Sequence, residues 1–337
     1  MEGKLISRRT ALRIGGSLAL AAVHQNRAAG QGAPTAGRII DVHHHYFAPV
    51  FVARRREQIL ESGGANVISW IPQTSLDQMD AAGVTTAILS SAGPGVWYGK
   101  DSFESNRAMA REMNEFGVRL ASDHPGRYGL FASLPLPDTE GSLREIEYAF
   151  GMLKADGVGL WSNFDGRFLG DAGYTAVFEE LNRRKAVAYV HPKITSDFDD
   201  AADPLRALGI NWTNTTRTII SMLNAGTFMR FPDIKFIFSH GGGLIWMVAP
   251  RLTLNAPEKM AALKRLYFDT AQVCSNPGAW DVFTRSADPT HILFGSDCPY
   301  GNVGAILKDL RSRNLTESQA AAIEHGNADP LFPRFRQ

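Results

Sequence analysis

Ile39-Ile40-Asp41-Val42-His43-His44-His45 is the stretch that decides the fold, because an apolar run ends here in side chains that can bind a metal. The same arrangement recurs in Val187–His191, Phe236–His240 and Ile292–Asp297. A parallel barrel gathers its chemistry where its strands end, at the C-terminal face. The four run ends therefore predict one shared site.

Strand-like apolar runs alternate with helical patterns after about residue 30, which is typical of repeated strand-helix units around a parallel sheet. We expect strands at Arg38–Tyr46, Val84–Ser90, Tyr128–Leu134, Gly157–Trp161, Ala186–His191, Ile234–His240, Leu266–Thr270 and His291–Asp297. We expect helices between them, among them Ser75–Ala82, Ser102–His124, Thr139–Ala155, Tyr174–Lys185 and Thr215–Phe231.

A closed ring is favoured over an open doubly wound sheet by where the candidate residues lie. An open sheet collects its ligand near one switch point, whereas the candidates here end the first, fifth, sixth and eighth runs. The predicted fold class is α/β, a (β/α)8 TIM barrel with loop insertions at its C-terminal face. We interpret Phe47–Pro72 and Lys193–Asn214 as those insertions, two loops that shape the substrate site.

Composition points to small-molecule chemistry. The 337 residues are 44% hydrophobic and 20% charged, and 35 basic against 34 acidic residues give a net charge of +1. That balance predicts no electrostatic attraction to nucleic acid or to an anionic membrane. Two cysteines, Cys274 and Cys298, exclude a four-cysteine metal site, and we expect partly buried free thiols rather than a disulfide.

The N-terminus differs from the rest of the chain in its order of basic, apolar and small residues. Ser7-Arg8-Arg9-Thr10 precedes the modestly apolar stretch Ala11–Val23, and the small residues Ala28-Ala29-Gly30 follow. This order resembles a twin-arginine export signal, and the apolar stretch is too short for a stable membrane span. We expect residues 1–30 to be this signal, residues 31–337 to be the barrel, and the protein to be periplasmic or exported. The alternative is a disordered or expression-derived N-terminus, and without a functional signal the protein would be cytoplasmic.

The histidines are the candidate nitrogen ligands of a metal. Alternate side chains share one face of a strand, so His43 and His45 can point into the barrel while His44 points away from it. Two adjacent imidazoles suit a borderline metal such as zinc, although a polar strand end is the mundane alternative. His191 ends a strand before Pro192 and is the candidate third nitrogen ligand.

Asp297 and His240 are the candidate acid-base residues. Asp297 lies in Gly295-Ser296-Asp297-Cys298-Pro299, where small residues let the backbone bend, and it can bind the metal, transfer a proton, or do both. His240 precedes Gly241-Gly242-Gly243 and is interpreted as a general base or an electrostatic anchor. The rival interpretation, a phosphate-binding loop, lacks the spacing and the lysine of a P-loop.

These motifs together resemble the amidohydrolase superfamily. Segments such as Leu134-Pro135-Leu136-Pro137-Asp138 and Phe231-Pro232-Asp233-Ile234-Lys235 resemble its amidohydrolase-2 branch, which contains aminocarboxymuconate-semialdehyde, 6-methylsalicylate and γ-resorcylate decarboxylases. The resemblance covers nearly everything from Arg38 onward. It implies that His43, His45, His191 and Asp297 are metal ligands and that His240 is a catalytic residue beside the metal. Hydrolytic relatives hold a second metal through a lysine after the fourth strand, where this chain has Ser162-Asn163, so a single metal is implied.

The resemblance implies a mononuclear, metal-dependent, non-oxidative decarboxylase of an aromatic or unsaturated carboxylic acid. Zinc is the first choice of metal, manganese is the second, and a homodimer is the assembly suggested by relatives. The runner-up function is hydrolysis of a lactone or amide by the same residues, and a third is a metal-holding binding protein without turnover. Aromatic residues in the predicted active-face loops suit a planar substrate, and Trp161 and Phe47 are the candidate substrate-binding residues.

Overall fold

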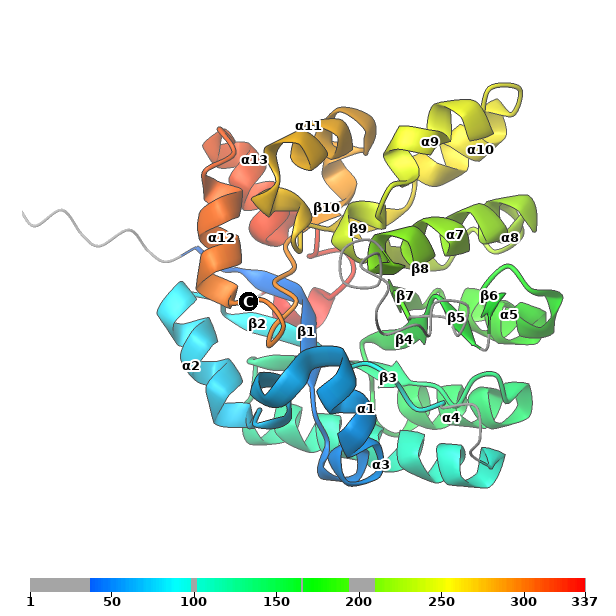
Figure 1. The fold of residues 1–337 in the computed structure, drawn as a ribbon, viewed down its shortest axis with the longest axis vertical. Coiled ribbons are helices and arrows are strands. Elements are labelled where there is room, and N and C mark those ends of the chain that lie inside the picture. Colours follow the sequence, from blue (N-terminus) through cyan, green and yellow to red (C-terminus); the bar gives the residue numbers. More distant parts are fainter. Residues whose placement is uncertain (1–36, 98–101, 165, 194–209, 337) are drawn as a thin grey trace, which may run out of the picture. The chain divides into compact units, whose positions relative to one another are not determined.

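A ring of parallel strands forms the centre of the molecule, and helices surround it (Figure 1). The computed structural model describes residues 37–97, 102–164, 166–193 and 210–336. The eight strands of the sheet, in their spatial order, are β1 (Ile40–Tyr46), β2 (Thr86–Ser91), β3 (Tyr128–Ser133), β4 (Gly157–Trp161), β7 (Val187–His191), β8 (Lys235–Phe238), β9 (Tyr267–Asp269) and β10 (Ile292–Leu293). A short hairpin, β5 (Asn163–Phe164) and β6 (Arg167–Phe168), follows β4.

The ring closes between its first and last strands. Backbone hydrogen bonds run from Val42 N to Phe294 O at 3.0 Å and from His45 N to Cys298 O at 2.7 Å. Neighbouring strands within the sheet pair in parallel. The predicted (β/α)8 TIM barrel is therefore confirmed, and all eight strand ends meet at one face.

Helices cover the outside of the ring. They are α1 (Pro49–Ile68), α2 (Pro72–Ala82), α3 (Phe103–Asp123), α4 (Thr139–Gly151), α5 (Thr175–Arg183), α7 (Ile210–Asn224), α8 (Thr227–Arg230), α9 (Ile245–Leu252), α10 (Pro257–Lys264), α11 (Pro277–Ser286), α12 (Val303–Arg311) and α13 (Glu317–Ala321). Local signals set their ends: the side chain of Ser102 caps α3 by accepting from Ser105 N, and α2 stops at Gly83, whose φ of 75° favours glycine. Among the described residues, no helix combines the length and hydrophobicity needed to span a membrane.

Two apolar layers hold the barrel together. One lies between the strands and the helices, where Met109 and Met113 of α3 are fully buried. The other fills the barrel interior and includes Val42 and Phe131, together with Leu331 and Phe332 from the C-terminal segment. The ring of Phe332 lies 5.8 Å from that of Phe131, so the end of the chain packs into the barrel core.

Three sequence expectations about local structure were wrong. The segment Phe47–Pro72 is mostly the helix α1 rather than a loop, because Pro49 starts the helix and a run of helix-forming residues continues it. The helix expected at Thr215–Phe231 begins at Ile210 and breaks at Gly226, whose φ is 71°. The last strand is only Ile292–Leu293, so Asp297 lies beyond it. Most of the other predicted loop, residues 194–209, lies outside the described residues, as does the predicted export signal.

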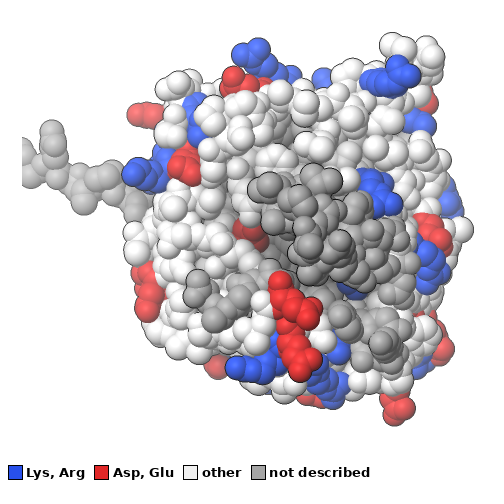
Figure 2. Space-filling view, viewed as in Figure 1, with Lys and Arg blue, Asp and Glu red and all other residues white. Residues whose placement is uncertain are grey.

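The thiols of Cys274 and Cys298 are free, as expected, and they are fully rather than partly buried. Charged side chains of both signs are scattered over the face shown in Figure 2, without a large area of one sign. This distribution agrees with the net charge of +1.

Candidate metal centre and active site

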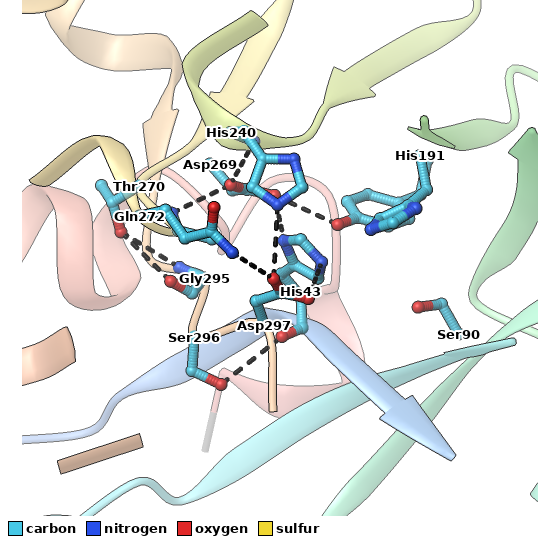
Figure 3. Close-up of polar contacts among 12 residues, drawn as sticks. His43, Ser90, His191, His240, Asp269, Thr270, Gln272, Gly295, Ser296 and Asp297 are labelled. Carbon is cyan, nitrogen blue, oxygen red and sulfur yellow. Dashed lines mark hydrogen bonds and ion pairs between the residues drawn. The ribbon is translucent and has the colours of Figure 1, made fainter. Parts of the chain in front are cut away.

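Histidine side chains and one carboxylate meet at the C-terminal end of the barrel, where Figure 3 labels His43, His191, His240 and Asp297. His43 and His45 come from β1, and His191 ends β7. Their ring centroids lie 5.0 Å apart for His43 and His45, 5.1 Å for His43 and His191, and 4.8 Å for His45 and His191. Asp297 Oδ1 lies 3.0 Å from His43 Nε2 and 3.1 Å from His45 Nε2. The structure therefore brings all four predicted ligands together.

A β-bulge in β1 points two of these histidines inward. The pairing of β1 with β2 shifts register within Asp41–His44. Before the bulge, Ile40 and Val42 lie inside the barrel. An extra residue reverses the alternation of side chains, so His43 and His45 also face inward although they have the opposite parity. Strand periodicity predicted that the two share a face but did not reveal the bulge.

Backbone carbonyls fix two of the imidazoles. Nδ1 of His45 donates to the carbonyl of Ser91 at 3.1 Å, and Nδ1 of His191 donates to the carbonyl of Pro192 at 3.0 Å. Because a carbonyl oxygen only accepts, the proton belongs on Nδ1, and Nε2 keeps its lone pair. Nε2 of His191 is buried and has no hydrogen-bond partner among the described residues. This is the arrangement found around metal-ligating histidines, so these residues fit a metal.

Asp269, at the end of β9, fixes the third imidazole and was missed in the sequence. Its Oδ2 lies 2.9 Å from His43 Nδ1 and accepts from Tyr189 Oη at 3.1 Å. Its Oδ1 accepts from the backbone N–H groups of His240 at 2.9 Å and Ala271 at 3.0 Å. Asp269 therefore holds two neighbouring strand ends in place. The available signal was its position, since it closes the seventh apolar run as the other site residues close theirs.

The electrostatics leave two neutral imidazoles beside an ionised carboxylate. Burial, reinforced by the neighbouring histidines, lowers the pKa of His191 well below 6.5, and burial also lowers the pKa of His45. Burial acts in the same direction on His43, but Asp269 and Asp297 outweigh it and raise the pKa of His43 to about 10. Burial opposes ionisation of Asp297, yet His43 and His240 hold the pKa of that carboxyl well below 3.8. Neutral nitrogens and an anionic oxygen are the donors that a divalent cation requires.

His240 follows β8 and faces the second oxygen of Asp297. Its Nε2 lies 3.4 Å from Asp297 Oδ2, and Gln272 Nε2 donates to the same oxygen at 2.8 Å. Ligand atoms of His43, His191, His240 and Asp297 all lie within 4.8 Å of one another. This group contains His240 where the predicted ligand set has His45. His45 and His240 therefore both lie close enough to the carboxylate of Asp297 to act on a metal bound there or on the ligand of that metal.

His44 points away from this cluster, as predicted, into a separate buried network. Its Nδ1 lies 3.0 Å from Asp41 Oδ2, and its Nε2 lies 2.7 Å from Ser75 Oγ. Ser75 Oγ also accepts from Trp70 Nε1 at 2.8 Å, and Ser296 Oγ donates to Asp41 at 2.6 Å. His44, Asp41 and Ser75 are completely buried, so this network ties β1 to α2 and to the segment that carries Asp297.

Of the two predicted substrate-binding residues, Trp161 packs directly against a histidine of the site, and Phe47 lies one ring away from another. Trp161, at the end of β4, packs edge-on against His191 with ring centroids 5.3 Å apart. The ring of Phe47 lies 6.4 Å from that of Tyr300, which in turn lies 5.4 Å from the ring of His45. Both side chains are largely buried. Their substrate-binding role stays a prediction.

A protein-family model and the similar proteins of known sequence agree on one family for this chain. A protein-family model described as Amidohydrolase matches residues 40–334. The chain is 35% identical over 320 residues to a 6-methylsalicylic acid decarboxylase of Penicillium expansum, covering 88% of this chain and 97% of that protein. It is 33% identical over 324 residues to the decarboxylase macB of Penicillium terrestre, covering 88% and 95% of the two chains.

A solved structure shares the fold. It is a dihydroxybenzoic acid decarboxylase from Polaromonas sp. JS666, with bound manganese and the inhibitor 2-nitroresorcinol. The TM-score is 0.78 at 19% identity, and the match covers 89% of this chain and 98% of that one.

Proposed function

The chain belongs to the amidohydrolase family, and we propose on that premise that it is a metal-dependent carboxy-lyase that decarboxylates an aromatic carboxylic acid without oxidation. One observation carries the proposal: Asp297 turns Oδ1 toward the Nε2 atoms of His43 and His45 and Oδ2 toward His240. One oxygen can therefore bind a metal while the other handles a proton. The named decarboxylases among the relatives support this assignment.

The metal would be held by His43, His45, His191 and Asp297, with His240 within reach. A bound divalent cation would hold the substrate carboxylate and a neighbouring oxygen and reduce their negative charge. Zinc is our first choice for three histidines and one carboxylate, and manganese, present in the Polaromonas structure, is the alternative. Metal analysis of the purified protein distinguishes the two.

Asp297 and His240 would move the proton. The ionised carboxylate of Asp297 accepts the proton of a hydroxyl group next to the substrate carboxyl and passes it from Oδ2 to the ring carbon that bears the carboxyl group. The bond between that carbon and the carboxylate then breaks, its electron pair restores the aromatic ring, and carbon dioxide leaves. His240, 3.4 Å from Oδ2, stabilises the carboxylate between the two transfers. Proton transfer by a positioned group typically contributes about 100- to 10,000-fold to the rate.

The test is carbon dioxide release from a panel of hydroxybenzoates and muconate-type acids by metal-loaded protein. We expect release by the wild-type protein and none by the Asp297→Ala and His240→Ala variants. Opening of a lactone or amide instead, without carbon dioxide, would favour the hydrolase alternative. Metal binding without any turnover would favour a binding protein.

We also propose that residues 1–30 are a twin-arginine signal that directs export, and that the barrel assembles as a homodimer. The mass of the mature N-terminus in the native host tests the first statement, since retention of residues 1–29 contradicts export. Light scattering of the purified barrel tests the second.

A further inference from the structure

Three residues with a strained backbone conformation meet at one carboxylate oxygen of the site. Six described non-glycine residues have a positive φ, and three of them, Lys154, Lys185 and Asn314, are exposed residues just beyond the ends of helices. The other three follow β8, β9 and β10: His240 has a φ of 54°, Gln272 of 58° and Asp297 of 60°. A side chain in the left-handed region costs free energy, and such strain is retained mainly at functional sites.

The three strained residues at the strand ends contact one another. The side chains of His240 and Gln272 both point toward the carboxylate of Asp297 in Figure 3. Both reach the same atom, Oδ2, from 3.4 Å and 2.8 Å respectively. The opposite oxygen, Oδ1, faces the Nε2 atoms of the β1 histidines. The strained residues therefore surround the oxygen that is turned away from those two proposed ligands.

Gln272 differs from its two partners in exposure. His240 and Asp297 are 1% and 4% exposed, whereas Gln272 is an exposed residue. Core packing therefore does not explain why a long polar side chain stands at this strained position. Its amide, however, donates directly to Asp297 Oδ2. One fixed donor on one oxygen stops the carboxylate from turning about its last bond and exchanging the places of Oδ1 and Oδ2.

We propose that Gln272 is a positioning residue whose amide holds Oδ2 of Asp297 on the reacting side, so that Oδ1 stays toward the histidines. The inference rests on the proposed function for its kinetic consequence, but not for its geometry. An uncharged amide is suited to this task because it orients the carboxylate without adding a charge to the site. The strained backbone turn brings the side chain back over the barrel mouth from the end of β9.

The kinetic test compares Gln272→Met, which keeps the length of the side chain but removes the donor, with the wild-type protein. We expect kcat for decarboxylation to fall about 10- to 100-fold, the usual effect of losing an outer partner of a metal ligand. We expect KM to stay nearly unchanged, because the proton transfer rather than substrate binding is affected. A change confined to KM, or an unchanged kcat, overturns the proposal.

A second measurement does not depend on turnover. In protein loaded with Co²⁺, the visible absorption spectrum reports how the ligands are arranged around the metal. Gln272→Met should change this spectrum because Asp297 is free to turn, whereas the control Lys185→Gly should leave it unchanged. An unchanged spectrum in Gln272→Met overturns the proposal. Wild-type protein that binds Co²⁺ but releases no carbon dioxide contradicts the proposed function, and the spectrum still decides the role of Gln272.

Relieving the backbone strain by substitution with glycine tests whether the role of Gln272 is functional or structural. Gln272→Gly and Lys185→Gly each relieve a positive φ and add the same freedom to the unfolded chain. We expect both variants to show similar changes in Tm, while only Gln272→Gly loses activity and changes the Co²⁺ spectrum. A Tm clearly lower in Gln272→Gly than in Lys185→Gly would show that the glutamine supports the fold, which overturns the proposal.

Discussion

The two sides of β1 carry histidines beside aspartates, but the histidine nitrogens have different partners on each side. On the inner side, Nε2 of His43 and Nε2 of His45 face each other at 3.1 Å, with Asp297 Oδ1 beside both. On the outer side, both nitrogens of His44 have partners, Asp41 at 3.0 Å and Ser75 at 2.7 Å. Both sides are buried, and both pair histidine with aspartate.

The difference shows what separates a structural histidine from a candidate ligand. A buried polar atom is costly unless it is paired, and when both imidazoles are neutral at Nε2 the two lone pairs that face each other repel. The inner side is therefore stabilised by anything positive placed between its nitrogens, a proton or a metal cation. The outer side is already complete and needs no further partner. A histidine beside a carboxylate is thus not by itself evidence of a metal site. Nitrogen lone pairs that converge on one point are the stronger criterion for a metal ligand.

Removing a histidine from the inner side should have the largest effect. In His45→Ala we expect metal affinity to fall by more than about 100-fold, the upper end of what loss of an outer partner costs, because a direct ligand is lost. Activity should fall with it. Competition with a chelator, followed by metal analysis, measures the change. Metal affinity equal to that of the wild-type protein would show that His45 is not a ligand and would favour the group with His240 in its place.

Removing the histidine on the outer side should affect stability instead. In His44→Leu we expect the free energy of unfolding to fall by about 3 kcal/mol, because Asp41 and Ser75 each lose a partner in a buried region. The metal content of the folded fraction should stay near that of the wild-type protein. Urea unfolding of the metal-free proteins measures the difference.

Ser75→Ala is the matched control for this network. It removes one of the two contacts of His44 and the acceptor of Trp70 Nε1, but it leaves the contact of His44 with the carboxylate of Asp41, so its loss should be smaller, about 2 kcal/mol. If His44→Leu lost its metal without losing stability, the two sides of β1 would not differ as the hydrogen bonds indicate.

Much of the fold was predictable from the sequence because strand ends and site residues coincide. The run ending at His191 matches the end of β7, and parallel barrels bring such ends to one face. The predicted loop before α2 was wrong because Gly63-Gly64 was given more weight than the helix-forming residues around it. Helix propensity over 20 residues, with proline at the first turn, prevails over two glycines.

The sequence indicated the residues that gather at the candidate site but not the residues that support them. His43, His45, His191 and Asp297 were candidates from residue type and spacing, and they lie close together in the structure. Asp269 and Gln272 act through hydrogen bonds whose geometry depends on a bulge and on positive φ angles. Hydrophobic periodicity carries no information on either feature, so the hydrogen bonds of both residues become visible only in three dimensions, although the position of Asp269 at a strand end was a signal.

The smallest expected effect belongs to a half-buried carboxylate, Glu180 on α5, which sets a reference for the fully buried networks. The hydrogen bond from Arg183, with support from Arg184, lowers the pKa of Glu180 on α5 from 4.5 to about 2. A lowered pKa means that its contribution to stability is present above about pH 4.5 and fades as the pH falls toward 2. Glu180→Gln should therefore lose at most about 1 kcal/mol at neutral pH and almost nothing at low pH. Urea unfolding at both pH values checks this, with Glu179→Gln, an exposed neighbour on the same helix, as the control. If Glu180→Gln lost as much free energy of unfolding as His44→Leu, or if its loss persisted in acid, burial would not explain why the contacts of His44 stabilise more than those of Glu180.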